Sequence, residues 1–78
     1  MNRAEITDKI KEMIQEGLGV DQVELSADLQ KDYEIDSIGV MDFIMTVEEE
    51  FGVQFDDGDL EKMKTPEDVI EHLEQLLN

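Results

Sequence analysis

Residues 36–51 read Asp-Ser-Ile-Gly-Val-Met-Asp-Phe-Ile-Met-Thr-Val-Glu-Glu-Glu-Phe, and they carry the strongest structural signal in the chain. Asp36 is a good helix N-cap, and Gly52 is a suitable residue to end the helix. Successive helical residues turn by about 100°, so a helix from Ser37 to Phe51 gathers its apolar residues on one core-facing side. This core face consists of Val40, Phe43, Ile44, Val47 and Phe51.

The same helix has a second apolar side. Ile38 and Met45 fall opposite the core face, with Met41 at the boundary, and Asp42 and Glu49 lie beside them. Single exposed apolar side chains are ordinary and need no explanation. An apolar stripe that faces away from the core, next to a serine at the helix start, indicates a docking surface.

Ser37 stands at the start of this helix, where backbone N–H groups are unpaired and the helix dipole is positive. A phosphate attached there would be favoured electrostatically. Serine is also common at helix starts without any further role. Because Asp36 already provides the cap, we expect the Ser37 hydroxyl to be free.

The residues before this helix predict a first helix and a long loop. The first helix should run from about Asn2 to Gln15 or Glu16, with Asn2 as N-cap and Gly17 as the C-terminal stop. Residues 18–35 show no sustained period, and a loop of this length is usually functional or contains a short turn, here at residues 26–29. The apolar stripe of the first helix consists of Ile6, Ile10, Met13 and Ile14.

The residues after it predict a short helix and a last main helix. About one helical turn is expected near residues 60–63. The last helix begins with Thr65 as N-cap, Pro66 at its first position and Asp68 three residues after the cap. Its apolar stripe consists of Val69, Ile70, Leu73, Leu76 and Leu77. The sequence therefore predicts one all-α domain over residues 1–78, a four-helix bundle of three main helices and one short helix with a long first loop.

The charge of the chain selects among partners. It has 22 acidic and 6 basic residues, a formal net charge of −16, and no cysteine, which excludes disulfides and thiolate chemistry. Residues 32–61 hold eleven acids and no base. Nucleic acid would be repelled, whereas basic protein surfaces would be attracted. No signal peptide or membrane-spanning run is evident, so we expect a cytoplasmic protein without membrane insertion, and we expect it to be a monomer.

The run Asp36-Ser37-Ile38-Gly39-Val40, followed by an acidic and apolar helix that ends at residues 47–51, resembles the acyl carrier protein family. Length, acidity, the four-helix outline and the late Thr65-Pro66 helix start agree along nearly the whole chain. The resemblance implies that Ser37, flanked by Asp36, bears a 4'-phosphopantetheine arm transferred from coenzyme A. The thiol of that arm would carry acyl groups as thioesters in fatty acid or specialised polyketide or lipid biosynthesis, and the chain itself would be no enzyme.

The resemblance also implies partners and two sets of contact residues. The partners would be a phosphopantetheinyl transferase (holo-acyl-carrier-protein synthase) and acyl-transfer and condensing enzymes with basic docking patches. The implied partner-binding residues are Asp36, Ile38, Asp42, Met45, Glu48 and Glu49. The implied lining for an acyl chain, all of it also ordinary core, is Val40, Ile44, Val47, Phe51, Leu60, Met63 and Ile70.

Three departures leave the cargo open. Gly39 stands where fatty-acid carriers often have an acid, Ile38 replaces the common leucine, and residues 33–35 lack the usual small side chains. The Asp-Ser-x-Gly pattern also looks like D-alanyl and aminoacyl carriers, so a carrier of that kind is an alternative.

Three other classes compete with a carrier. An acidic adaptor without a prosthetic group would use the same surface and leave Ser37 inert. A calcium-binding loop would need glycine at its sixth position, but loops that start at Asp32 or Asp56 have Ser37 and Glu61 there, so no specific metal site is expected. An enzyme would need a base for Ser37, and His72 is expected to be solvated on the polar side of the last helix.

Overall fold

Four helices form in the computed structural model, which describes residues 1–77: α1 (Arg3–Leu18), α2 (Ser37–Phe51), α3 (Asp57–Lys62) and α4 (Pro66–Leu77). No strand occurs in this part of the chain. The all-α fold with three main helices, one short helix and a long first loop is therefore confirmed. α2 has the bounds that were predicted, with Asp36 as N-cap and Gly52 as C-cap.

α1 begins as expected and ends later than expected. Asn2 Oδ1 accepts the Glu5 N–H at 2.9 Å, and Glu5 Oε1 accepts the Asn2 N–H at 3.2 Å, which together form a capping box. The prediction that Gly17 ends this helix was wrong. The helix continues to Leu18, which packs against the core, and Gly19 adopts the left-handed conformation (φ 70°) that ends a helix without a steric penalty.

α3 begins three residues earlier than the predicted turn at residues 60–63. Asp56 and Asp59 form a reciprocal capping box, so the helix starts at Asp57 and ends before Met63. α4 starts at Pro66 as predicted. Thr65 Oγ1 accepts the Asp68 N–H at 3.1 Å, and Asp68 Oδ2 accepts the Thr65 N–H at the same distance.

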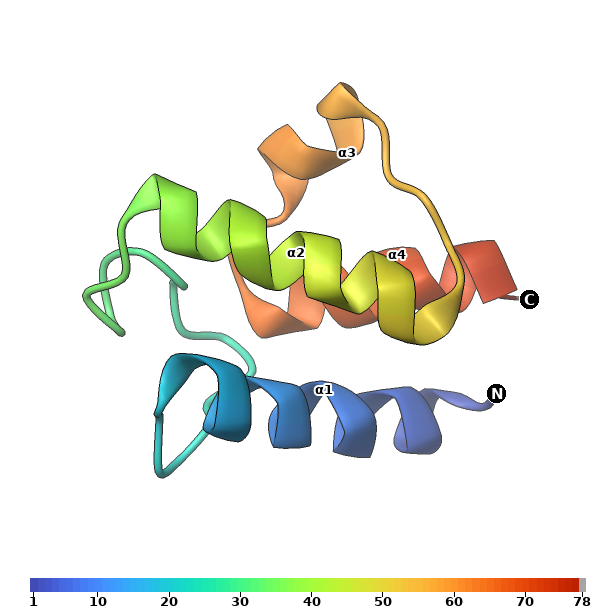
Figure 1. The fold of residues 1–78 in the computed structure, drawn as a ribbon. Coiled ribbons are helices and arrows are strands. Elements are labelled where there is room, and N and C mark those ends of the chain that lie inside the picture. The colour runs from blue at the N-terminus through green and yellow to red at the C-terminus, as the bar shows by residue number, and fades with distance from the viewer. Residues whose placement is uncertain (78) are drawn as a thin grey trace.

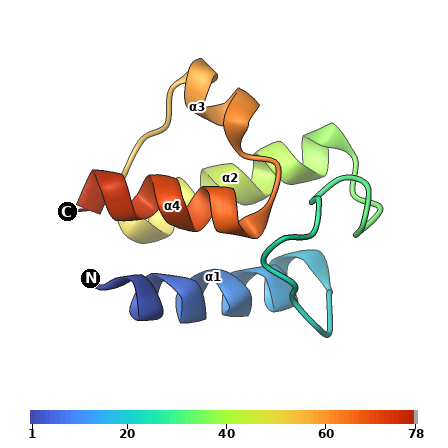
Figure 2. The ribbon, with the colours of Figure 1, turned by 180° about the vertical axis from the view of Figure 1, so that it is seen from behind.

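The three main helices lie side by side (Figure 1). α2 and α4 run in the same direction and α1 runs in the opposite one, so the two chain ends come to the same end of the molecule (Figures 1 and 2). α1 packs against both α4 and α2. The short α3 lies across the top of the bundle, beside α2 and α4 (Figures 1 and 2).

The core lies between the three main helices and is sealed at its edges by residues from the connections. Burying a valine, leucine, isoleucine, phenylalanine or methionine side chain stabilises a fold by roughly 1.5–3 kcal/mol. Leu29 closes the core from the long loop, and Phe55 and Met63 close it on either side of α3. The remaining buried apolar residues are Ile6, Ile10 and Ile14 from α1, Val40, Phe43, Ile44 and Val47 from α2, and Val69, Ile70 and Leu73 from α4.

Three ion pairs join α1 to its neighbours across the surface, and one of them places Arg3 Nη2 3.7 Å from Glu67 Oε1 of α4. Lys9 Nζ lies 2.7 Å from Glu50 Oε1 of α2, and this contact raises the pKa of Lys9 above its ordinary value. Arg3 Nη1 donates to Glu74 Oε2 of α4 at 3.1 Å. Exposed pairs of this kind each contribute on the order of 0–1 kcal/mol, so packing rather than charge pairing holds the bundle together.

The loop over residues 19–36 is held by backbone hydrogen bonds to the start of α4. The Leu29 N–H donates to the Lys64 carbonyl at 2.9 Å, and the Glu67 N–H donates to the Leu25 carbonyl at 2.9 Å. Instead of the single turn predicted at residues 26–29, two turns form, one closed by Ala27 N–H to the Glu24 carbonyl and one over residues 28–32. This loop therefore brings residues 28–31 beside Lys64 and delivers the chain to the start of α2.

Candidate functional site

The first turn of α2 leaves the Ser37 hydroxyl free. Asp36 has an extended backbone and its Oδ1 accepts the Gly39 N–H at 2.7 Å, while its carbonyl accepts the Val40 N–H at 3.1 Å. Ser37 is exposed, and its hydroxyl makes no hydrogen bond with any residue from 1 to 77. A free hydroxyl next to a carboxylate that is already occupied is suited to covalent modification.

The start of α2 also provides a favourable place for an anion. The N–H groups of Ser37 and Ile38 come before the first hydrogen bond within the helix and have no carbonyl partner. These N–H groups and the positive end of the helix dipole stabilise a phosphate at a helix N-terminus. A phosphate ester on Ser37 would therefore be held by the backbone of the chain itself.

Two residues shape the segment that leads into Ser37: Glu34 has a strained backbone, and Tyr33 is hydrogen-bonded to the backbone of Glu24. Glu34 has φ 54°, the left-handed region, which costs a residue with a side chain roughly 1–2 kcal/mol. Tyr33 supports this bend from the preceding position. Its hydroxyl accepts the Glu24 N–H at 2.8 Å and donates to the Glu24 carbonyl at 3.0 Å.

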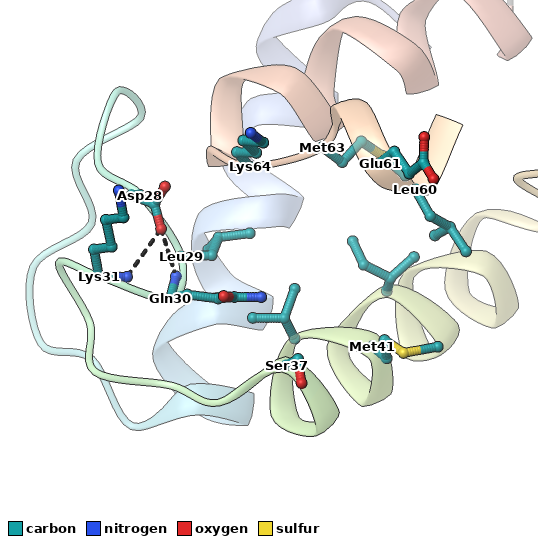
Figure 3. Close-up of a pocket in the computed structure, with 12 residues that line it drawn as sticks. Asp28, Leu29, Gln30, Lys31, Ser37, Met41, Leu60, Glu61, Met63 and Lys64 are labelled. Atoms are coloured by element: carbon teal, nitrogen blue, oxygen red, sulfur yellow. Dashed lines mark hydrogen bonds between the residues drawn. The ribbon is translucent and has the colours of Figure 1, made fainter. Parts of the chain in front are cut away.

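A pocket of about 330 Å³ opens beside Ser37, between α2, α3 and the long loop (Figure 3). This volume lies at the lower end of the roughly 300–1,000 Å³ typical of ligand pockets. Four of the residues predicted to line an acyl site lie here, namely Val40, Ile44, Leu60 and Met63. The other lining residues were not predicted: Asp28, Leu29, Gln30, Lys31, Ser37, Met41, Glu61 and Lys64.

Three residues of the predicted acyl lining lie elsewhere. Val47 and Ile70 are fully buried in the closed core between the main helices, and Phe51 is half-buried against that core at the far end of α2. The periodicity of α2 places Val40, Ile44, Val47 and Phe51 on one face, but only the part of this face nearest Ser37 borders the pocket. The loop residues Asp28 and Lys31 carry no periodic signal, so sequence patterning could not have found them.

Charged groups gather at the loop side of the pocket. Asp28 Oδ1 accepts the N–H groups of Gln30 and Lys31, each at 2.9 Å, and these two hydrogen bonds hold the pKa of Asp28 below its ordinary value. The positive charges of Lys31 and Lys64 act in the same direction. Neither lysine forms an ion pair within 4 Å with any of the residues described.

α3 forms the side of the pocket opposite the long loop, and contacts outside the pocket hold it in place. It has no buried residue of its own. His72 of α4 holds it, since its Nε2 lies 3.4 Å from Asp59 Oδ1, and its ring packs against Phe55 with centroids 6.5 Å apart. The expectation of a solvated His72 was wrong, because α3 covers that side of α4 and leaves only 20% of the His72 side chain exposed.

The outer face of α2 combines exposed apolar and acidic residues. Ile38, Met41 and Met45 are 76%, 55% and 56% exposed, which puts Met41 on this face as well. Three of the acids implied as partner contacts, Asp36, Asp42 and Glu49, are exposed.

Glu48 is placed differently from the other implied contacts. It is half-buried, and its Oε2 accepts the Phe55 N–H at 2.7 Å, so its carboxylate is engaged inside the molecule. The next residue, Glu49, remains exposed. The structure thus assigns Glu48 a role in holding the connection between α2 and α3.

Residues 1–77 lack two further kinds of feature. No cluster of acidic, histidine or cysteine side chains there is arranged to hold a metal ion. No helix in this range has both the length and the apolar character that crossing a bilayer requires.

Comparison with known proteins places the chain in a family. The family model described as a phosphopantetheine attachment site matches residues 8–73. The acyl carrier protein of Thermotoga maritima is 45% identical, with 97% of this chain and 96% of that protein covered. The acyl carrier protein of Petrotoga mobilis is 40% identical, with 100% and 94% covered. The solved structure of the Enterococcus faecalis acyl carrier protein superposes with a TM-score of 0.79 at 31% identity, covering 96% of this chain and 98% of that one.

Proposed function

The chain belongs to the acyl carrier protein family, and we propose that its phosphopantetheine arm is attached to Ser37. The observation that carries this proposal is the free, exposed Ser37 hydroxyl at the N-terminus of α2, on the edge of the pocket. The residues present fit the phosphopantetheine arm, because the unpaired N–H groups of the first turn of α2 suit its phosphate. The adjacent pocket offers space and apolar surface for the rest of the arm. When bound, the arm supplies the thiol that the chain, which has no cysteine, lacks.

Ser37 takes part in the attachment as the acceptor. Its oxygen forms a bond to the phosphorus that carries the pantetheine, the pyrophosphate bond of coenzyme A breaks so that adenosine 3',5'-bisphosphate leaves, and the hydroxyl proton passes to a base. The base for that proton belongs to the transferase, since Ser37 has no side-chain hydrogen-bond partner among the residues described. The chain itself positions the hydroxyl and catalyses nothing in this step.

The outer face of α2 is the proposed docking surface for the transferase and for acyl-transfer and condensing enzymes. Ile38, Met41 and Met45 offer apolar contact area, and Asp42 and Glu49 offer charge. Basic patches on the partners would be drawn to a carrier of net charge −16, which raises association rates. Two copies of the carrier repel each other because both are strongly negative, so we propose that the protein is a monomer. We also propose that it works in the cytoplasm.

The chain has two serines, which provide a matched test. The wild type, Ser37→Ala and Ser26→Ala would each be incubated with coenzyme A and a broad-specificity transferase, and their intact masses recorded. We expect one phosphopantetheinyl group on the wild type and on Ser26→Ala, and none on Ser37→Ala. Loading of Ser37→Ala would overturn the assignment of Ser37.

A further inference from the structure

The pocket beside Ser37 has two lysines on its loop side that the proposed function does not use. Lys31 lies in the long loop, and Lys64 lies in the short connection between α3 and α4. They are 33 positions apart in sequence, and the hydrogen bond from Leu29 N–H to the Lys64 carbonyl brings them to the same side. The chain has 6 basic residues against 22 acids, and two of these six line the pocket beside Ser37.

Both ammonium groups have hydrogen-bonding capacity to spare. A lysine ammonium has three donors, and neither Lys31 nor Lys64 has an acidic partner within 4 Å among residues 1–77. Two acids share the lining, Asp28 and Glu61. The Asp28 carboxylate is already engaged by the N–H groups of Gln30 and Lys31.

Lys64 lies across the pocket from the attachment point, and Lys31 lies on the long loop at its side. Figure 3 shows Ser37 on one side of the pocket and Lys64 on the opposite side. Buried apolar side chains lie in the same lining, namely those of Leu29, Val40, Ile44 and Met63. A phosphate ester on Ser37 would stay at the serine, so the group that reaches the lysines comes from the distal part of the arm.

We propose that the pocket selects acyl cargo that ends in a carboxylate, with the methylenes on the apolar lining and the carboxylate between Lys31 and Lys64. This inference rests on the attachment of the arm to Ser37. A purely aliphatic chain of equal length would gain the same apolar contact without the charge-assisted hydrogen bonds. Exposed lysine–carboxylate pairs are modest, so we expect a preference of about fivefold that weakens with salt.

The test compares two cargoes of the same carbon number on the full-length protein. The transferase would load the arm from adipoyl-coenzyme A or hexanoyl-coenzyme A, and intact mass would verify loading. The first readout is the set of chemical shifts of the lysine ε-methylene groups, measured for the unloaded arm and for both cargoes. The second is the rate at which neutral hydroxylamine cleaves the thioester, divided by the rate for the same acyl group on free pantetheine.

The matched variants differ only in which lysines lose their charge. Lys31→Gln combined with Lys64→Gln removes both cations of the pocket. Lys11→Gln combined with Lys62→Gln removes two lysines that also lack an ion pair within 4 Å but lie outside the pocket lining. Both double variants have the same net charge, so general repulsion of an anionic cargo cancels between them.

We expect adipoyl cargo, and not hexanoyl cargo, to shift the Lys31 and Lys64 signals and to be protected from cleavage. This protection should fall about fivefold in the Lys31→Gln, Lys64→Gln variant and persist in the control. Equal behaviour of both cargoes, or equal loss in both variants, would overturn the proposal. Shifts already present with the unloaded arm would also overturn it, because they would assign the lysines to the phosphodiester. Failure to load the arm at all would instead count against the proposed function.

Discussion

The Ile35 side chain packs directly against Gly39 across the start of α2. A Cβ atom placed on Gly39 would lie 2.7 Å from Ile35 Cγ2, closer than real Cβ contacts allow. This contact connects the last loop residues to the first helical turn, on either side of Ser37. Gly39, which appeared in the sequence as a departure from fatty-acid carriers, is thus a steric requirement set by Ile35.

Gly39→Ala should therefore destabilise the protein although alanine favours helices. The clash costs about 1–3 kcal/mol, and the gain in helix propensity returns only about 0.5–1 kcal/mol. We expect a net loss of about 1 kcal/mol in the free energy of unfolding, measured by urea denaturation. In the Ile35→Ala background the same substitution should be neutral or stabilising, and an equal loss in both backgrounds would contradict the contact.

The hydrogen bond from Phe55 N–H to Glu48 predicts a difference between two neighbouring acids. Glu48→Gln weakens a charge-assisted bond in a half-buried place, so we expect a loss of roughly 1–2 kcal/mol in the free energy of unfolding. Glu49→Gln removes the same charge from an exposed position and should have little effect or stabilise slightly. The urea midpoints of the two variants check this, and equal midpoints would show that Glu48 is not a structural residue.

The sequence predicted the helices well where their end signals were unambiguous. Asp36 and Gly52 mark the two ends of α2, and Thr65 with Pro66 marks the start of α4. At each of these helix ends no other strong signal competes nearby in the sequence. Gly17 and Gly19 are both suited to end α1. The helix ends at Gly19 because Leu18 is stabilised by packing against the core. Several aspartates could cap α3, and only the reciprocal Asp56–Asp59 pair does so.

The site was predicted in part for a similar reason. The outer face of α2 follows from helical periodicity, and four pocket residues, Val40, Ile44, Leu60 and Met63, were implied by the resemblance to acyl carrier proteins. The two lysines could not be named in advance, because Lys31 and Lys64 line one pocket only once the hydrogen bond from Leu29 N–H to the Lys64 carbonyl joins two distant segments. His72 was misjudged because the short α3, which covers it, has too little periodicity to be placed from sequence.

The excess of acids predicts that the protein is stabilised by salt. Residues 32–61 hold eleven acids and no base, so their mutual repulsion should outweigh the few ion pairs that salt weakens. We expect the melting temperature to rise with ionic strength and with divalent cations, as measured by circular dichroism. A melting temperature that does not change with ionic strength would show that this repulsion is unimportant.

Asp28 predicts a distinct effect at low pH. Its pKa is lowered in the folded state by the N–H groups of Lys31 and Gln30, so the folded protein binds fewer protons here than the unfolded chain. The stability that this charge contributes is present above the unfolded value of about 3.9 and is lost as the pH falls through the lowered folded value. Asp28→Asn should melt below the wild type near neutral pH, and the gap should close in acid.

The control for this effect is Asp21→Asn, which removes one charge from the same loop. Within residues 1–77 the Asp21 side chain accepts no backbone N–H group, so no gap of this kind is expected. A gap between wild type and Asp28→Asn that stays constant down to the acid limb would contradict the linkage argument.

The attachment of the arm to Ser37 is tested most directly by locating it within the loaded wild-type protein. The protein would be loaded from coenzyme A and digested with trypsin, and all of its peptides, including the one that spans residues 32–62, would be fragmented in a mass spectrometer. We predict that the added phosphopantetheinyl mass lies between Asp36 and Ile38, on Ser37 alone. An added mass on Ser26, on a threonine or on no residue would contradict the assignment of this chain as a carrier through Ser37.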